Sequence, residues 1–234
     1  MGITLAGFRP RRGLGGPISV VFSGVDHALT SNAQWSVVAP DPGALQVGDV
    51  VLVYLSVING GEDGVAPGTN GWGFFGGDFL ENAGRNYGSY LWVRRVASAG
   101  SIPVEQRIFS FFTNFVGSST QLVIVVLRGV RNTGFISGDF DNRVFRTAVP
   151  PAAAAPLSQV RGGIGRLGIS FGHTQSGSIG GPPPGWTSIV QQSNAAGIAY
   201  CEAQWFPAAA TTSQSARSPS PTARGFGLVH AIAP

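Results

Sequence analysis

Glycine and proline interrupt this 234-residue chain so often that long helices are excluded. It contains 35 glycines and 16 prolines, and only 11% of its residues are charged. Gly and Pro disfavour helix interiors, and the usual helix formers are scarce. Between these interruptions lie runs of five to ten apolar, β-branched and aromatic residues, each closed by Gly, Pro, Asn or Ser. This is the pattern of strands joined by turns, so we expect an all-β fold.

Ten segments have this strand pattern. They are residues 18–23, 34–38, 49–57, 89–97, 105–112, 121–128, 165–171, 187–191, 198–205 and 225–232. The runs "DVVLVYLSV" and "LVIVVL" are apolar at nearly every position, which predicts burial on both faces at the centre of a sandwich. The register of "SYLWVRRV" stays open. The segment "NGWGFFGGDFLEN" is predicted to be a loop, because glycine disfavours strands.

An internal repeat appears when the chain is laid on itself with a shift of 114 residues. The matched pairs are Gly48 with Gly162, Ser56 with Ser170, and Trp72 with Trp186. The half-repeats span about 34–147 and 157–234. They could be separate modules or could share one core, and small cores are marginal alone. We therefore predict a single jelly-roll-like β-sandwich domain over 17–234, built from two diverged half-repeats.

Several segments together resemble a family of phage and prophage virion proteins with a β-sandwich fold. They are "VGDVVLVYLSV", "YLWVRRVASAG", "LVIVVLRGV" and "PPPGWTSIV". The likeness covers roughly residues 35–234 and is one of pattern rather than of a catalytic motif. It implies a tail-fibre, spike or head-decoration component. The insertion "GFFGGDFLENAGRNYG" departs from the family pattern, so the functions of its loops are not carried over.

The first sixteen residues, "MGITLAGFRPRRGLGG", are predicted to be an N-terminal docking arm. Their apolar start, arginines and glycines are typical of a segment that becomes ordered against a neighbour, although a disordered tail would look similar. The residues expected to dock to the particle are Phe8, Arg9, Arg11 and Arg12. No stretch reaches the ~18 apolar residues of a membrane span, and no signal peptide is recognisable. We expect synthesis in the host cytoplasm and a final location in the virion.

Two catalytic signatures overlap in "RGGIGRLGISFGH", at residues 161–173. One is G-x-G-x-x-G and the other is G-x-S-x-G, centred on Ser170 and followed by His173. Both work at a strand-to-helix turn, and the Gly- and Pro-rich sequence that follows predicts no helix. The single cysteine, Cys201, excludes an intramolecular disulfide. We therefore predict no catalytic residues, no enzyme activity and no cofactor.

Three sets of residues are candidates for other roles. Asp139, Asp141 and Asn142 resemble half of a calcium loop but lack the closing glutamate, so no metal site is predicted. Phe74, Phe75 and Phe79 are candidates for a protein interface or for glycan stacking. Trp72 and Trp186 are expected to be structural, as the repeat suggests.

The net charge of +4 does not predict nucleic-acid binding, because most arginines are spread singly and phosphate binding needs clusters. We expect a non-enzymatic structural protein on the exterior of a tailed-phage virion. Its expected partners are other virion proteins, sister subunits in a homo-oligomer, and host-surface polysaccharide. The alternative is a secreted carbohydrate-binding or carbohydrate-cleaving domain.

Overall fold

The protein is an all-β sandwich, as the sequence predicts. The computed structural model describes residues 18–30, 34–58, 71–82, 85–112, 118–130, 143–147, 167–174, 181–182, 184–205 and 225–232. The strands are β1 (Ser19–Thr30), β2 (Gln34–Val38), β3 (Val50–Ile58), β4 (Gly73–Asn82), β5 (Arg85–Arg95), β6 (Ile108–Phe112), β7 (Ser118–Arg128), β8 (Arg143–Thr147), β9 (Leu167–Thr174), β10 (Thr187–Asn194), β11 (Gly197–Trp205) and β12 (Gly225–Ile232). Within these residues the only helical element is a single 3₁₀ turn, η1 (Val104–Gln106).

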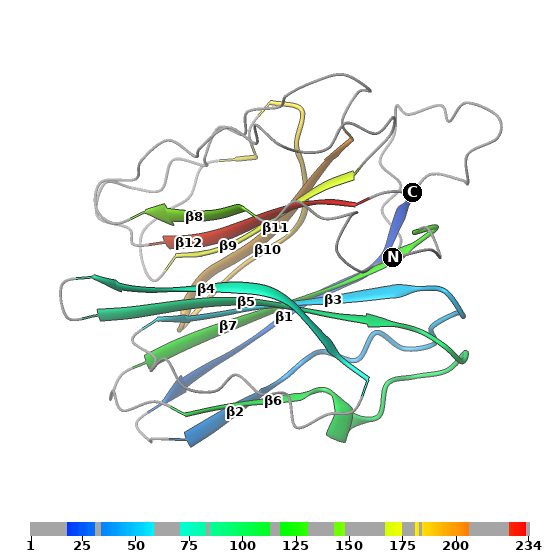
Figure 1. Ribbon diagram of the computed structural model, residues 1–234, viewed down its shortest axis with the longest axis horizontal. Helices are drawn as coiled ribbons and strands as arrows, with labels where there is room; N and C mark the ends of the chain where they lie inside the picture. Colours follow the sequence, from blue (N-terminus) through cyan, green and yellow to red (C-terminus); the bar gives the residue numbers. More distant parts are fainter. Residues whose placement is uncertain are drawn as a thin grey trace.

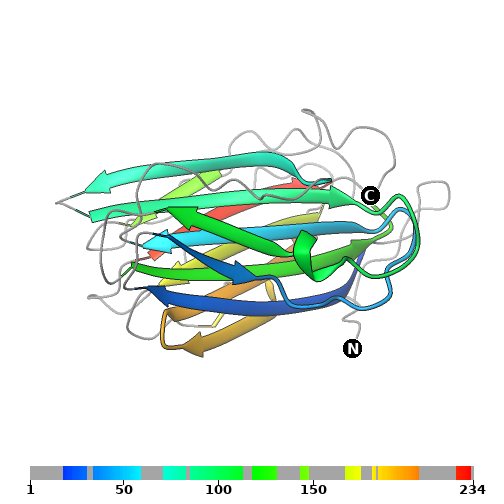
Figure 2. The same cartoon turned by 90° about the horizontal axis from the view of Figure 1, so that it is seen from below.

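The strands form three layers (Figure 1). The middle layer is a five-stranded sheet in the order β1-β7-β3-β5-β4, and a second five-stranded sheet, β10-β11-β9-β12-β8, covers one of its faces. The two-stranded ribbon β2–β6 covers the other face, and Figure 2 shows it crossing in front of the middle sheet. All strand pairs within the three layers are antiparallel.

The central residues of β3 and β7, in the middle sheet, have no access to solvent. Residues 50–55 of β3 and 122–127 of β7 are all 0% exposed. This confirms the prediction from "DVVLVYLSV" and "LVIVVL". The physical reason is the third layer, because a sheet in a simple two-layer sandwich exposes one face to water.

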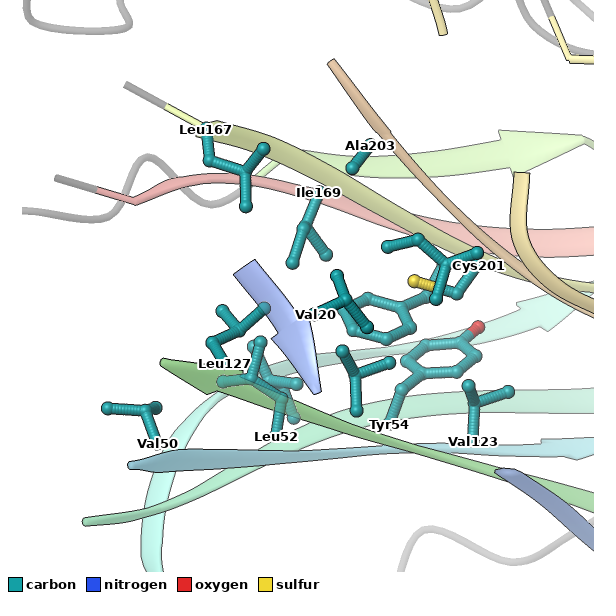
Figure 3. Close-up of a cluster of buried hydrophobic side chains, with 14 of the residues drawn as sticks. Val20, Val50, Leu52, Tyr54, Val123, Leu127, Leu167, Ile169, Cys201 and Ala203 are labelled. Carbon is teal, nitrogen blue, oxygen red and sulfur yellow. The ribbon is translucent and has the colours of Figure 1, made fainter. Parts of the chain in front are cut away.

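One hydrophobic core lies between the two five-stranded sheets (Figure 3). Leu52 and Tyr54 of β3 point into it from the middle sheet, and Ile169 and Phe171 of β9 point into it from the second. The rings of Tyr54 and Phe171 stack across the core, with their centroids 5.2 Å apart and their planes 16° apart. Such a contact adds about 0.5–1.5 kcal/mol to the area that it buries. The two sheets therefore form one sandwich with a shared core.

A second core lies between the middle sheet and the β2–β6 ribbon. Val53 of β3 and Ile124 of β7 point into it, opposite Val37 of β2 and Phe109 of β6. The open register of "SYLWVRRV" is settled by the two cores, because Leu91 and Val93 belong to the first and Trp92 to the second.

The two five-stranded sheets have the same internal order. With β2 and β6 set aside, the first sheet contains β1, β3, β4, β5 and β7 in chain order, and the second contains β8 to β12. If the five strands of each sheet are numbered in chain order, their order across the sheet is 1-5-2-4-3 in both. The contacts between the sheets are also equivalent. The contact of β1 with β10 matches that of β4 with β8, and the contact of β7 with β11 matches that of β5 with β12. The sheets are thus related by an approximate two-fold axis that passes between β3 and β9.

The Gly-Trp turns occupy equivalent places in this scheme. Gly71 before Trp72 has φ of 98° and Gly185 before Trp186 has φ of 85°. Both values lie in the left-handed region, which only glycine adopts at little cost. The strand that follows, β4 or β10, contains a β-bulge at the same position in each half, between Phe74 and Gly76 or between Ser188 and Val190.

The residue offset of the predicted repeat is wrong along the central strands. Leu52 of β3 is paired with Val93 of β5, and Ile169 of β9 is paired with Ala203 of β11. Val93 and Ala203 are each paired with the residue that follows a Gly-Trp turn, so they are equivalent, and Leu52 corresponds to Ile169. The offset there is therefore 117 residues, and it falls to 114 only at the Gly-Trp turns. Ser56 consequently corresponds to His173 and not to Ser170. The connection between the strands differs in length between the halves, which loops tolerate readily.

Three predictions about the strands need a correction. The segment "NGWGFFGGDFLEN" is not a loop, since Gly73–Asn82 forms β4, paired along its length with β5. Hairpin pairing and the contact of Phe74 with Trp92 outweigh the weak strand propensity of its glycines. Arg143–Thr147 forms β8, which the sequence did not predict. The predicted strand 105–112 begins at Ile108, because Val104–Gln106 is the 3₁₀ turn.

Gly185→Ala tests the requirement for a left-handed residue before Trp186. We expect a loss of about 1–2 kcal/mol in the free energy of unfolding, because a Cβ disfavours this backbone region. Gly181→Ala is the matched control, since a Cβ there meets nothing within 4 Å and the backbone is not left-handed. The control should change stability by less than about 0.5 kcal/mol in urea unfolding. Equal effects of the two substitutions would contradict the role given to Gly185.

Candidate functional site

A buried carboxylate lies at one end of the middle sheet, where β3 begins. Asp49 is 1% exposed and accepts two hydrogen bonds from Arg128 at the end of β7, Nε to Oδ1 at 2.8 Å and Nη2 to Oδ2 at 2.8 Å. The backbone N–H of Gln46 donates to the same Oδ2 at 2.8 Å. A bidentate arginine–carboxylate pair fixes both distance and orientation. It therefore joins the ends of the two fully buried strands.

The neighbouring backbone completes this cluster. The N–H of Gly48 donates to the carbonyl of Val96 and the N–H of Val96 donates to the carbonyl of Asp49, both at 2.9 Å. Leu45 and Gly100 exchange two further backbone hydrogen bonds. The segments "VGD", "RVASAG" and "RGV", which carry part of the resemblance described above, thus meet around Asp49, through its backbone and its carboxylate.

The electrostatics of this pair favour its charged form. Burial acts to raise the pKa of Asp49, but the hydrogen bonds from Arg128 and Gln46 and the charge of the guanidinium outweigh it, so the pKa lies below its usual value. The hydrogen bond with Asp49 raises the pKa of Arg128. A lowered carboxyl pKa contributes stability above the ordinary value of 3.8, and this stability is lost as the pH falls through the folded-state pKa.

Asp49→Asn tests the contribution of this pair to stability. We expect a loss of about 2–3 kcal/mol in urea unfolding at pH 7, toward the low end for a buried pair because the Arg128 side chain is 37% exposed. Asp41→Asn is the control, since the Asp41 side chain is 54% exposed and its Oδ2 lies 3.6 Å from Arg107 Nη2. It should cost no more than about 0.5 kcal/mol. A loss below 1 kcal/mol for Asp49→Asn would contradict this role.

A second polar cluster lies inside the core between the two sheets. His173 on β9 and Ser56 on β3 are both 0% exposed, with 3.1 Å between Nδ1 and the serine Oγ. The other ring nitrogen, Nε2, lies 3.0 Å from the carbonyl oxygen of Ala196. Because a carbonyl can only accept, Nε2 carries the proton, and Nδ1 accepts from the Ser56 hydroxyl.

An amide pair continues this cluster toward the β10–β11 turn. Gln121 of β7 donates from Nε2 to Asn194 Oδ1 at 2.8 Å, and Asn194 donates from Nδ2 to Gln121 Oε1 at 3.0 Å. The same Asn194 oxygen accepts the N–H of Ala196 at 2.9 Å. Ser56 and Gln121 are also cross-strand partners. The cluster therefore binds both sheets to one turn with hydrogen-bonded groups.

This cluster is a structural contact rather than a nucleophilic site. A serine beside a histidine is the chemical basis of an activated nucleophile, but neither side chain has any surface that a substrate could reach. The G-x-S-x-G signature lies in β9, and its Ser170 is paired with Glu202 in the ladder. His173, the residue next to that signature, points into the core.

His173 predicts a specific dependence of stability on pH. Burial lowers its pKa from 6.5 to about 4, against the smaller opposing effect of the hydrogen bond to Ala196. Between those two pH values the unfolded state binds a proton that the folded state does not. Stability should therefore fall by about 3 kcal/mol as the pH falls from 6.5 to 4.

The measurement is urea unfolding across this range for the parent and for His173→Gln. The variant should lose most of the slope between pH 6.5 and 4, whereas Ser56→Ala, which keeps the imidazole buried, should retain it. An unchanged slope in His173→Gln would show that another group causes the effect.

An aromatic surface lies at the start of β4, on the side of the β2–β6 ribbon. Phe74 is 56% exposed, and its ring lies against Trp92 of β5, with centroids 4.9 Å apart. The Nε1 of Trp92 is buried and, in the part of the chain that the structure describes, is one of two buried side-chain polar atoms with no hydrogen-bond partner; the other is the Ser119 hydroxyl. We call Phe74, Trp92, Trp72 and Arg94 the aromatic–arginine surface.

Trp72 and Arg94 connect this surface to the 3₁₀ turn. The indole Nε1 of Trp72 donates to the carbonyl of Gln106 at 2.8 Å, and its ring meets Phe109 edge-on. The guanidinium carbon of Arg94 lies 6.0 Å from the centre of the Trp72 ring, and its Nη1 donates to Gln106 Oε1 at 2.6 Å. Trp72 thus anchors the turn to the middle sheet, while its equivalent, Trp186, is buried at 7% exposure.

Several predicted site residues are not placed. The docking-arm residues and the calcium candidates lie outside the described residues: Phe8, Arg9, Arg11, Arg12, Asp139, Asp141 and Asn142. Phe75 and Phe79 lie on β4, the former in its bulge and the latter paired with Gly88, but their side chains are not described. Of the three phenylalanines, only Phe74 is therefore shown at a surface.

Asp49 and Arg128 form a pair that the sequence analysis missed. The available signal was an acid immediately before one fully apolar run and an arginine immediately after another.

Within the described ranges no three His, Cys, Asp or Glu residues are grouped as metal ligands, and no helix among them is long and apolar enough to cross a membrane. Comparison with known proteins finds no matching family model, curated protein or solved structure.

Proposed function

We propose that the protein is a non-enzymatic structural component of the exterior of a tailed-phage virion or a related particle. The observation that carries this proposal is the cluster around Asp49. The segments that resemble virion proteins meet there and hold the two central strands together. The resemblance therefore lies in residues that build the sandwich, and the proposed role is that of a rigid body that makes contacts.

The intramolecular hydrogen bonds of the reactive and charged side chains support the same role. Ser56 and His173 bind each other in the core, and three arginines donate to groups of the fold: Arg128 to Asp49, Arg107 to the carbonyls of Ala39 and Ile102, and Arg95 to the carbonyl of Gly48. These cations are engaged in intramolecular contacts rather than arrayed for phosphate. This favours a contact-making protein over a nucleic-acid binder.

In the proposed assembly the arm 1–16, with Phe8, Arg9, Arg11 and Arg12, docks the sandwich to other virion proteins, and copies associate as a homo-oligomer. The chain is made in the host cytoplasm and incorporated from there. The start of β1 and the end of β12, the first and last described strands, lie at the same end of the sandwich (Figures 1 and 2), which suits attachment of the body from that end.

Deletion of residues 1–16 tests the docking role. We expect the shortened chain to keep the melting temperature of the parent, because the described sandwich begins at residue 18, and to be absent from purified particles. The full chain, labelled with an epitope, should be seen on the particle surface by immunogold electron microscopy. Absence of the full chain from particles would refute the virion role, and normal incorporation of the deletion would refute the docking role of the arm.

A carbohydrate-binding function is the second candidate, favoured by the exposed ring of Phe74, which lies against Trp92, and by Arg94 on the same strand as Trp92. Aromatic faces stack on sugar rings, and guanidinium groups donate to hydroxyls and carboxylates. A glycan array with the full chain tests it, and Phe74→Ala should reduce binding about tenfold or more. Val104→Ala, at a residue that is 53% exposed on the 3₁₀ turn, is the control and should leave binding unchanged.

A further inference from the structure

One side of the sandwich is formed by two edge strands from different sheets. β4 is the last strand of the middle sheet and β8 is the last strand of the second sheet, and the two are in contact. Among the described strands, β4 pairs only with β5 and β8 only with β12. Each therefore has one row of backbone groups directed away from its own sheet, and such rows are templates for pairing with another chain.

The two edge strands run in the same direction. β4 is antiparallel to β5, which is antiparallel to β3, so β4 runs with β3. By the same steps β8 runs with β9. β3 and β9 run together, because Tyr54 contacts Phe171 and, two residues later on each strand, Ser56 contacts His173. A two-fold axis that lies in this side, runs along the strands and passes between β4 and β8 would therefore place each β4 beside the β8 of a second copy, with the two strands parallel.

The charges of the two strands are opposite. β4, "GFFGGDFLEN", carries Asp78 and Glu81 and no basic residue, whereas β8, "RVFRT", carries Arg143 and Arg146 and no acidic residue. Placing β4 against β8 of another copy brings an acidic strand to a basic strand twice. Opposite charges across an interface set its register and exclude wrong partners.

The opposite side of the sandwich supplies an internal comparison. It is formed by β1 and β10, which occupy the places equivalent to β8 and β4. β10, "TSIVQQSN", has no charged residue, and the one acid of β1, Asp26, accepts the N–H of Val38 at 3.1 Å. That side has no complementary pair of charged strands. Among the described side chains, each side has one large apolar side chain exposed on an edge strand, Phe74 on β4 and Leu29 on β1, so the charges are what distinguish the two sides.

We propose that the β4–β8 side joins two copies of this chain into a dimer, with β4 of each copy parallel to β8 of the other. This inference rests on the homo-oligomeric role proposed above and assigns its interface. The partner is a second copy because the side is complementary to itself under a two-fold axis, as isologous interfaces require.

Sedimentation equilibrium of the full chain tests the interface by exchange of charge. The parent should have twice the 24.2 kDa mass of the chain, and its dissociation constant should rise on the order of tenfold between 50 and 500 mM salt. Asp78→Arg with Glu81→Arg should give a monomer, and so should Arg143→Glu with Arg146→Glu. All four substitutions together should restore the dimer. Gln191→Arg with Gln192→Arg on β10 is the matched control and should stay dimeric.

A monomeric parent at about 100 μM, or a dimer that survives either charge reversal, would overturn the proposal. Amide hydrogen exchange of the unmodified chain gives a measurement that does not depend on the folding of variants. Protection in β4 and β8 should rise with protein concentration while that in β10 stays constant, and equal behaviour of the three strands would also overturn it. Incorporation into particles, measured separately, distinguishes a failed interface from a failed virion role.

Discussion

Burial of the middle sheet on both faces is the constraint on which the other features depend. A strand without a solvent face must be apolar along its length, and β3 and β7 satisfy this over residues 50–55 and 122–127. Polar groups then enter at the ends of those strands, where burial favours groups that find hydrogen-bond partners. The Asp49–Arg128 pair occupies one end, and the cluster of Ser56, Gln121 and their partners occupies the other. The apolar centre thus determines where the hydrogen-bonded contacts lie.

The equivalence of the two five-stranded sheets explains why these contacts pair particular residues. Tyr54 corresponds to Phe171 and Ser56 to His173, and in each case the two equivalent residues contact each other. This is expected only near a two-fold axis. It supports the interpretation that the sandwich is made of two diverged copies of one sheet, of which the first has acquired β2 and β6 as an additional layer.

The sequence predicted the strands best where apolar runs are long or strongly bounded. The bounds of Gln34–Val38 and Gly225–Ile232 agree with the prediction, and so does the double burial of β3 and β7. It failed for β4, whose glycines are compensated by pairing with β5, and for the offset along β9, which depends on loop length. Asp49 and Arg128 were missed as a pair because they lie 79 residues apart and only the ladder of β3 with β7 brings them together.

The hydrogen bond between Ser56 and His173 has a consequence for the history of such a fold. In a dimer of identical chains, a residue on the symmetry axis faces its own twin, so two serines or two histidines would meet there. Once both halves belong to one chain, each side of the axis can mutate alone. A fixed donor can then face a fixed acceptor, and a tyrosine can face a phenylalanine. Covalent fusion thereby permits chemical asymmetry at the point where symmetry would otherwise forbid it.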